Sequence, residues 1–410
     1  MKVPRCKGMR DLMPQDMARF RRIEAEFRNC CLGWGYQEIR TPALEYLHLF
    51  TSAGTLSPDM LGRVYSFLDW DGWSGERVVL RPDGTIPLAR LYVENFQTMP
   101  VARLFYVENM FVFEGTGEES RERWQCGAEV VGGRRPEGDV ELISIALEAV
   151  SKLGVGSVEV RLAHAGLLKT YLEELGLSGE EKAAVLDQIF SGNMDVLGGL
   201  KGKNPEAEKQ LQLLFGLKGT SPGFVGNLKS VFSSSLPALE SSIDELGRIA
   251  ELLTGLGCSY QIDFTSGRGF EYYTGVIFGF YCSERRIGGG GRYDELIPLV
   301  GGKEVCASGF ALYIDELMAL VEEVAQGERI LVRAKDGEGL RGSLDVARDL
   351  REAGYTAVFD LGYELTTDFR WIIDMRSGEG IELIDQVGGK KQRTLSSSEL
   401  LGLLEEAGCK

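Results

Sequence analysis

The sequence of 410 residues is poor in histidine, with His48 and His164 as its two copies. Eight cysteines are present, but no two of them have the C-x-x-C spacing. Structural zinc sites need clustered Cys and His ligands, so we expect no metal site. Two histidines also leave little room for a Ser/His/Asp or Cys/His mechanism. Cysteines in this arrangement are typical of a reducing compartment, where thiols stay free.

The sequence also lacks long apolar runs and has fewer basic than acidic residues. The sequence has no stretch of about 18 apolar residues, and residues 1–10 lack the apolar core of a secretory signal. Asp and Glu number 61 against 45 Lys and Arg, which gives a net charge of −16. Proteins that bind polyanions usually present a basic face, so the charge argues against nucleic acid as a ligand. We therefore expect a cytoplasmic protein that contacts no membrane.

Apolar periodicity predicts an α+β protein. Apolar residues recur every three or four positions over 17–32, 85–94 and 139–153, which predicts helices there. Short alternating runs predict antiparallel strands. These runs are 36–42, 78–81, 103–107, 110–114, 125–131, 260–263 and 272–281.

The chain divides into two expected domains. Residues 1–327 form the larger one, and a helical insertion is expected in it at about 166–256, where Gly, Ser and Pro break the helical spacing. A strand, a helix and a second strand follow in order after Gly327, which is typical of a βαβ unit. Residues 328–410 are therefore expected to form a small C-terminal α/β domain.

A run of four glycines at 288–291 is followed by Arg292, Tyr293 and Asp294. The segment SGRGFEYYTG precedes it at 266–275. Glycine lets the backbone approach a ligand closely, and a tyrosine offers its ring to a core and its hydroxyl to a pocket. These residues are candidates for a binding site, and the alternative is a hairpin with a glycine-rich loop.

Two further segments carry candidate polar side chains. In the sequence RPDGT, Asp83 or Thr85 could cap a helix, a role that needs no ligand. Gln125, Gly127 and Glu129 share one face of a predicted strand. Polar groups on a buried strand face need partners, and a ligand amine or imidazole would supply them. The alternative is a strand face that is turned to solvent.

Five motifs in this order resemble the histidyl-tRNA synthetase family. They are GMRDLMP at 8–14, GYQEIRTP at 35–42, LRPDGT at 80–85, RGFEYY at 268–273 and GGRYD at 290–294. The match runs in register over roughly residues 7–320 and continues more weakly into the C-terminal domain. The resemblance implies the antiparallel sheet with flanking helices of class II aminoacyl-tRNA synthetases, followed by a small anticodon-binding-like α/β domain.

The resemblance also implies a pocket for L-histidine. Its matching positions are Asp83, Thr85, Gln125, Glu129, Arg268, Tyr272, Tyr273 and Tyr293. Two carboxylates and a glutamine suit an ammonium group and an imidazole N–H, and an arginine suits a carboxylate. Asp83 stands where the family usually has glutamate, which shortens the reach of the side chain and keeps its charge.

The cations that the family uses in catalysis are missing from their expected places. Val112 stands where the family has the arginine that clamps the α-phosphate of ATP, and Glu316 replaces the arginine of the last motif. In that motif Tyr313 replaces a small glycine, and Asp315 replaces a glutamate. Cations at the phosphates usually supply the largest electrostatic contribution to such chemistry. We therefore expect no catalytic residues, no adenylation and no cofactor.

These departures resemble a non-catalytic branch of the family, whose members are regulatory subunits for the short-form catalytic subunit of ATP phosphoribosyltransferase. That branch implies a homodimeric core, a role in the first step of histidine biosynthesis and feedback by histidine. Residues 328–410 hold 16 acidic against 12 basic residues, so no tRNA is expected as a partner. Two alternatives stay open: a histidyl-tRNA synthetase or degenerate histidine-adenylating ligase, and a histidine-sensing binding module.

Histidine-dependent exchange of pyrophosphate into ATP tests the consequence of the missing cations. We expect no exchange from the purified chain, because Val112 and Glu316 offer no positive charge to the phosphates of ATP. A histidyl-tRNA synthetase that is assayed alongside provides the positive control. Exchange above the level measured without histidine would contradict this expectation and favour the ligase.

Overall fold

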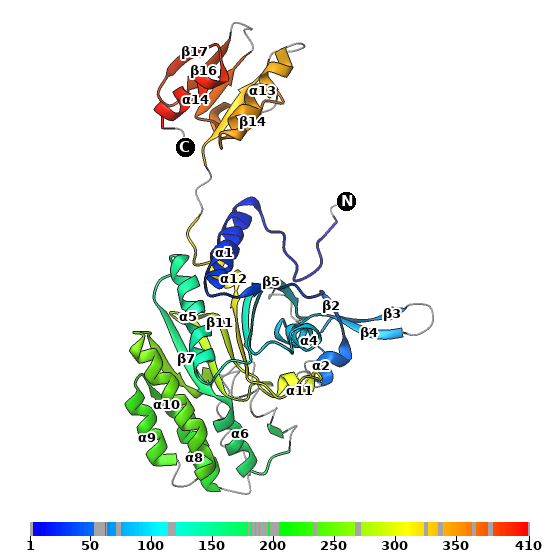
Figure 1. Cartoon of the computed structure of the whole chain (residues 1–410), viewed down its shortest axis with the longest axis vertical. Helices are drawn as coiled ribbons and strands as arrows, with labels where there is room; N and C mark the ends of the chain where they lie inside the picture. Colours follow the sequence, from blue (N-terminus) through cyan, green and yellow to red (C-terminus); the bar gives the residue numbers. More distant parts are fainter. Residues whose placement is uncertain are drawn as a thin grey trace. The chain divides into compact units, whose positions relative to one another are not determined.

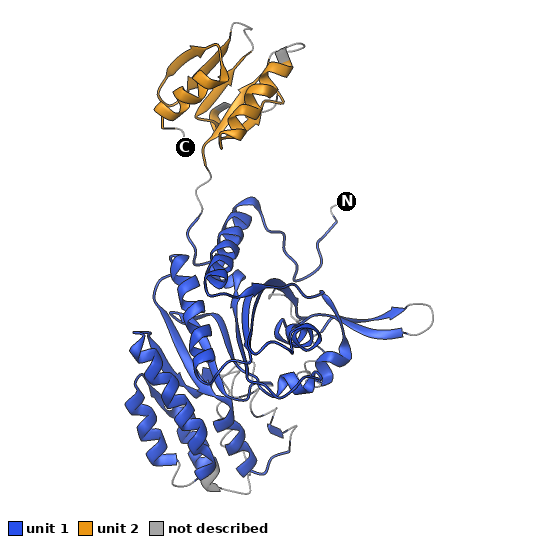
Figure 2. Cartoon of the chain, in the orientation of Figure 1, with its two compact units in different colours: residues 1–323 blue, residues 324–410 orange. Residues whose placement is uncertain are grey.

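The computed structural model describes residues 3–52, 62, 64–70, 75–113, 120–178, 181–182, 185, 188, 196, 205–232, 236–266, 272–323, 327–334, 339–362, 366–375 and 380–408. The chain forms two compact units, residues 1–323 and residues 324–410, which Figure 2 shows in blue and orange. Among the helices in the described ranges, none is both long and apolar enough to cross a membrane.

A nine-stranded sheet forms the centre of the first unit (Figure 1). In spatial order its strands are β1 (Gln37–Glu38), β5 (Ala102–Phe111), β6 (Glu122–Val131), β12 (Ala307–Tyr313), β11 (Arg285–Arg292), β10 (Val276–Cys282), β7 (Val158–His164), β9 (Tyr260–Asp263) and β8 (Lys218–Gly219). The β1–β5 and β7–β9 pairs are parallel, and the other pairs are antiparallel. The predicted α+β class with a mainly antiparallel sheet is confirmed.

Helices α1 (Pro14–Gly33) and α5 (Glu137–Lys152) pack against one another and against one face of this sheet. α1 buries Phe20, Ile23 and Phe27, which recur at helical spacing. The ring of Phe27 meets Phe105 of β5 and Phe310 of β12 edge to face, at centroid distances of 6.1 and 6.2 Å. Large side chains therefore fill this face of the sheet.

Helix α4 (Thr85–Asn95) begins against the opposite face of the sheet. The loop before it is fixed by a buried ion pair, in which Arg81 Nη1 lies 2.6 Å from Glu108 Oε2 on β5. Arg81 also donates to the carbonyl of Thr41 at 2.8 Å. Because a buried arginine must satisfy its donors, these contacts hold the loop in one position. The start of α4 is thereby brought close to the central strands.

The remaining elements of the first unit lie around the sheet. Strands β2 (Leu44–Tyr46), β4 (Gly75–Leu80) and β3 (Ser66–Trp70) form a small antiparallel sheet of their own. Figure 1 shows β3 and β4 projecting from the rest of the unit as a ribbon. The short helices are α2 (Leu47–Ser52), α11 (Leu296–Leu299) and α12 (Ile314–Met318). α11 packs against α4.

Four longer helices gather beyond β7 in Figure 1. They are α6 (Ala165–Glu174), α8 (Pro205–Gly216), α9 (Pro222–Phe232) and α10 (Glu240–Gly255). Glu245 of α10 reaches the sheet, where it pairs with Arg292 and lies 3.4 Å from His164 Nε2. Burial lowers the pKa of His164 to about 3, so its imidazole is neutral near pH 7. The sequence analysis did not predict strand β8, which pairs with β9 within this region.

In its described residues the second unit has a five-stranded sheet and two α-helices. In spatial order the strands are β14 (Thr356–Phe359), β13 (Arg329–Arg333), β15 (Trp371–Asp374), β16 (Ile381–Asp385) and β17 (Lys390–Thr394). The chain passes from β13 through α13 (Gly339–Glu352) to the parallel strand β14, so this part is a βαβ unit. Helix α14 (Ser397–Glu406) begins at Ser396, whose hydroxyl accepts the N–H of Glu399.

The glycine run at 288–291 lies inside strand β11 and is buried between β10 and β12. The expected alternative of a glycine-rich hairpin loop is wrong, because the chain turns between Cys282 and Arg285 instead. A Cβ at Gly290 would overlap the carbonyl oxygen of Gly309 on β12. These strands approach too closely for side chains at this point.

Likewise, the runs 103–107 and 110–114 are not two separate strands. β5 continues without a break to Phe111 and pairs with β6 along its whole length, because β6 offers a partner at every position. Residue 114 lies outside the described residues.

Candidate functional site

A row of small residues lies on the face of the large sheet away from α1 and α5, and we call this region the trough. Its floor is defined by Gly127, Gly289, Gly291, Gly309 and Ala311, which the strand register places on one face. Ala311 is partly exposed although it belongs to a central strand of a nine-stranded sheet. Because these residues have little or no side chain of their own, side chains from neighbouring segments lie directly over the backbone here.

The carboxyl group of Glu129 stands at one end of this trough. Thr85 donates its hydroxyl to Glu129 Oε1 at 2.8 Å, and Tyr293 donates its hydroxyl to Oε2 at 2.6 Å. A Cβ at Gly309 would overlap Oε2, so the carboxyl group occupies the space above that glycine. Burial raises the pKa of Glu129 to about 8, although the two hydrogen bonds act in the opposite direction. Glu129 can therefore hold or release a proton near neutral pH.

Asp83 is the second carboxyl group at this end. Its Oδ1 accepts the backbone N–H of Ile86 at 2.9 Å, so the predicted capping of α4 by Asp83 is present. Its Oδ2 accepts a long hydrogen bond from the Tyr272 hydroxyl at 3.4 Å. Burial raises the pKa of Asp83, and Asp83 in turn raises the pKa of Glu129 by repulsion. Two crowded acids favour a cationic ligand between them.

Tyrosine rings form the wall beside the two acids. The ring centroid of Tyr272 lies 4.8 Å from that of Tyr273 and 6.0 Å from that of Tyr293. Tyr273 lies over Gly291, with its Cδ1 atom 2.9 Å from the place of a Cβ there. Tyr106 of β5 lies over Gly127 in the same way. Aromatic faces of this kind attract cations and stack on planar rings.

The remaining predicted positions are Gln125 and Arg268. Gln125 shares the face of β6 with Glu129, is partly exposed and stands opposite Tyr313 of β12. Arg268 lies outside the described residues. The structure thus brings six of the eight predicted positions into mutual contact, and it aligns Gln125 with them on one face. These six are Asp83, Thr85, Glu129, Tyr272, Tyr273 and Tyr293.

Arg286 is a trough residue that the sequence analysis missed. Its guanidinium Nη2 atom lies 2.5 Å from the place of a Cβ at Gly289, so it covers that part of the floor. Burial opposes the charge, but the nearby hydroxyl groups of Tyr313, Tyr281 and Tyr273 raise the pKa of Arg286 overall. Simple alternation along the strand would put Arg286 on the other face, so the strand pattern does not indicate this residue.

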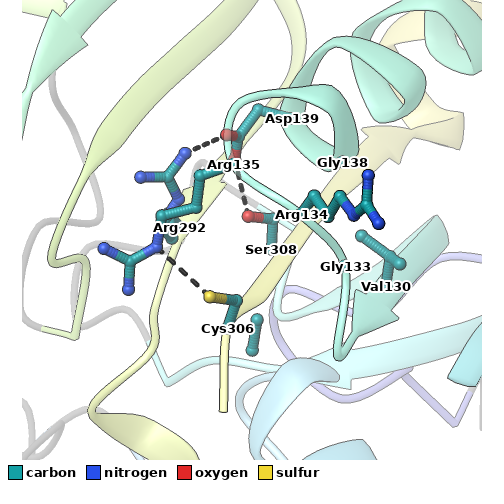
Figure 3. Close-up of a pocket in the computed structure, with 10 residues that line it drawn as sticks. Val130, Gly133, Arg134, Arg135, Gly138, Asp139, Arg292, Cys306 and Ser308 are labelled. Atoms are coloured by element: carbon teal, nitrogen blue, oxygen red, sulfur yellow. Dashed lines mark hydrogen bonds and ion pairs between the residues drawn. The ribbon is translucent and has the colours of Figure 1, made fainter. Parts of the chain in front are cut away.

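A different pocket lies on the opposite face of the sheet, at the start of α5 (Figure 3). Several of its polar groups pair with each other. Asp139 accepts from Arg292 and, at 2.6 Å, from the Ser308 hydroxyl, while Arg135 Nε lies 3.2 Å from Cys306 Sγ. These contacts account for the charges there by ordinary packing. Within the described ranges, no group of three His, Cys, Asp or Glu side chains could hold a metal ion.

The positions of the missing cations can also be located. Val112 follows the end of β5, and its N–H donates to the carbonyl of Arg121 at 3.0 Å. Glu316 of α12 lies 3.6 Å from Arg285 Nε. Asp315 pairs with Arg10. An apolar side chain thus stands at one of the two expected cation positions and a carboxylate near Arg285 at the other, and the neighbouring Asp315 pairs with an arginine as well.

Known proteins with this fold were compared with the chain. The profile of the histidyl-tRNA synthetase family matches residues 8–317. A chain from Dehalococcoides mccartyi, named ATP phosphoribosyltransferase regulatory subunit, is 46% identical over 407 residues, which are 98% of each chain. The histidine–tRNA ligase of Methanosarcina acetivorans is 31% identical over 422 residues, again 98% of each chain.

Solved structures share the fold over almost the whole chain. One from Bacillus halodurans, described as an ATP phosphoribosyltransferase regulatory subunit/histidyl-tRNA synthetase, has a TM-score of 0.77 at 23% identity and covers 91% of this chain and 98% of its own. Histidyl-tRNA synthetase from Nostoc sp. PCC 7120 has a TM-score of 0.76 at 19% identity, covering 99% of this chain and 100% of its own.

The fold and the profile define a protein of the histidyl-tRNA synthetase type, with the class II synthetase sheet. Identity of 46% over nearly the full length is higher than the 31% to the ligase. The chain belongs to the family of ATP phosphoribosyltransferase regulatory subunits.

Replacement of Glu129 by glutamine should weaken the pH dependence of stability. A carboxyl group whose pKa rises from 4.5 to about 8 on folding binds its proton more tightly in the folded state. Its contribution to the free energy of unfolding is therefore present at low pH and is lost as the pH rises through this interval. Between about pH 5 and about pH 9, the Tm of E129Q should fall less than that of the wild type.

The control is Glu284→Gln, because the Glu284 side chain is 89% exposed. E284Q should follow the wild-type melting curve across the same pH range. Equal losses of Tm in E129Q and the wild type would show that the Glu129 pKa is not raised on folding.

Proposed function

We propose that this chain is a non-catalytic regulatory subunit of ATP phosphoribosyltransferase and that it binds L-histidine in the trough. The observation that carries the proposal is the Glu129 carboxyl group, held by Thr85 and Tyr293 above a glycine floor. The 46% identity to a chain named ATP phosphoribosyltransferase regulatory subunit supports the proposal from outside the structure. The partner is the short-form catalytic subunit, in the first step of histidine biosynthesis.

The chemistry of the acidic end suits an imidazole and an ammonium group. A carboxyl group with a pKa of about 8 is largely protonated near pH 7, so it is ready to exchange its proton for a ligand N–H donor. Asp83 supplies a second acceptor, and the rings of Tyr272 and Tyr273 offer flat apolar contacts. Arg268, by the family resemblance, faces the carboxylate of the ligand.

The residues at the expected phosphate-binding positions support a non-catalytic role. Val112 is apolar, and Glu316 brings a negative charge that interacts with Arg285. Neither neutralises a phosphate, so adenylation of histidine has no electrostatic support from these positions. The acidic balance of residues 328–410 argues in the same direction against tRNA. We infer a homodimeric core for the subunit from the resemblance alone.

A histidine-adenylating ligase is the second candidate, because a histidine–tRNA ligase is 31% identical to the chain over its whole length. A histidine-sensing module with some other partner is the third. The pyrophosphate exchange assay separates the first two candidates. Reconstitution with a short-form catalytic subunit separates the first and the third.

Reconstitution tests the proposal directly. Phosphoribosyl-ATP formation by a short-form catalytic subunit should depend on this chain, and L-histidine should inhibit the mixture. E129Q should still support the reaction but should bind histidine at least about ten-fold more weakly, because a charged hydrogen-bond acceptor is lost. R268A should abolish histidine binding, whereas the exposed control E284Q should behave as the wild type.

Two results would overturn parts of the proposal. A catalytic subunit that is equally active with and without the chain would remove the regulatory role. Unchanged histidine binding by both E129Q and R268A would move the histidine site out of the trough, for example to a subunit interface.

A further inference from the structure

A buried ionic junction joins the central sheet to the helices α6, α8, α9 and α10, which we call the helical insertion. Arg292 is the last residue of β11, and its side chain is only 2% exposed. Its Nη2 atom pairs with Asp139 of α5, and its Nη1 atom pairs with Glu245 of α10. Glu245 therefore links the helical insertion directly to a central strand.

The residue that follows Arg292 reaches the opposite face of the sheet. Tyr293 donates its hydroxyl to Glu129 Oε2 at 2.6 Å, whereas Arg292 contacts Asp139 of α5. The backbone N–H of Tyr293 donates to the carbonyl of Ala307 at 2.8 Å, which fixes the chain beside β12. Because the two residues are adjacent, a shift of the backbone at Arg292 also moves Tyr293.

The helical insertion has a second attachment in the same place. The carbonyl of Arg292 accepts the backbone N–H of Thr274 at 2.7 Å, and Thr274 directly follows the tyrosine pair at 272–273. The next carbonyl, that of Gly275, accepts the N–H of Ala165 at 2.8 Å. Ala165 is the first residue of α6. The insertion is thus bonded, at α6 and at α10, to the segments that carry the tyrosines of the trough.

Apolar packing already attaches α10 to the rest of the first unit. Its buried residues recur at helical spacing, and they include Ile243, Leu246 and Leu253. A buried ion pair adds little net stability, because the loss of hydration offsets the attraction between the charges. Such a pair does fix the relative position of the elements that it joins, since moving the carboxylate away leaves a guanidinium nitrogen unpaired. The Glu245–Arg292 pair therefore sets where α10 lies relative to β11.

We propose that Glu245 is a positioning residue that couples the helical insertion, through Arg292, to the tyrosines of the trough. The proposal rests on the proposed function, since it names a route by which contacts of the insertion reach the ligand site. Coupling between two sites is reciprocal. A contact that fixes the insertion therefore steadies Tyr293, and a ligand that binds beside Tyr293 steadies the insertion.

Hydrogen exchange of the full chain without ligand, followed by mass spectrometry, tests this coupling. In E245A the amides of 240–255 and of 288–294 should exchange at least about five-fold faster, because a buried Arg292 nitrogen loses its acceptor. Exchange in 102–111 of β5 should stay unchanged. Alanine favours a helix more than glutamate does, so helix propensity does not explain faster exchange in α10. E245Q keeps an acceptor oxygen and should lie closer to the wild type.

Asp244→Ala is the matched control, because Asp244 is the adjacent residue of α10, is 51% exposed and pairs with Lys229 of α9. D244A should leave exchange in 288–294 at the wild-type rate. Faster exchange of 240–255 in E245A with 288–294 unchanged would overturn the proposal. Equal acceleration of 288–294 in D244A, or of 102–111 in E245A, would show a general loss of stability and would overturn it as well.

The reciprocal effect is measured with L-histidine as the probe. Histidine should slow exchange in 240–255 of the wild type, and this protection should be lost in E245A. Histidine that binds the wild type and leaves 240–255 unchanged would overturn the proposal. Failure of the wild type to bind histidine would instead remove the proposed function, and the comparison of E245A with D244A without ligand would still decide the coupling.

Discussion

The space above Gly309 is the constraint on which the site depends. Only a residue without a Cβ lets the Glu129 carboxyl group stand there, between the hydroxyl groups of Thr85 and Tyr293. The same absence of a Cβ at Gly127, Gly289 and Gly291 lets Tyr106, Arg286 and Tyr273 lie directly over the sheet. The other face is filled by large aromatic residues of the sheet and α1, so the strands stay rigid under the open floor.

Acidic and basic side chains both lie over this row of glycines. One end has two carboxyl groups whose pKa values burial raises, and repulsion from Asp83 raises the pKa of Glu129 further. The other end has a guanidinium that a bulge has turned from the packed face to the open one. The family resemblance implies that Val112 and Glu316 stand where a synthetase has arginines for the phosphates of ATP. Under the proposed function, a binding pocket persists on the synthetase fold without its chemistry.

Much of this could be predicted from the sequence. The helices and most strands follow from apolar periodicity, and the positions Asp83, Thr85 and Glu129 follow from motifs in family order. Three features could not be predicted. The glycine run reads as a loop because glycine is common in turns, yet in β11 it permits close strand packing. Arg286 was missed because a one-residue bulge inverts the alternation of the strand. The runs 103–107 and 110–114 join in one strand because β6 pairs with both. That partner lies further along the chain and cannot be recognised from the two runs themselves.

The most direct test of the account is the number of protons released when L-histidine binds, measured by calorimetry in buffers of different ionisation enthalpy. Because Glu129 has a pKa of about 8 in the free protein, binding a cationic donor against it must displace its proton at about pH 7. The wild type should therefore release more protons than E129Q, and the difference should shrink as the pH rises above about 8. Equal proton release by the two proteins at every pH would contradict the account.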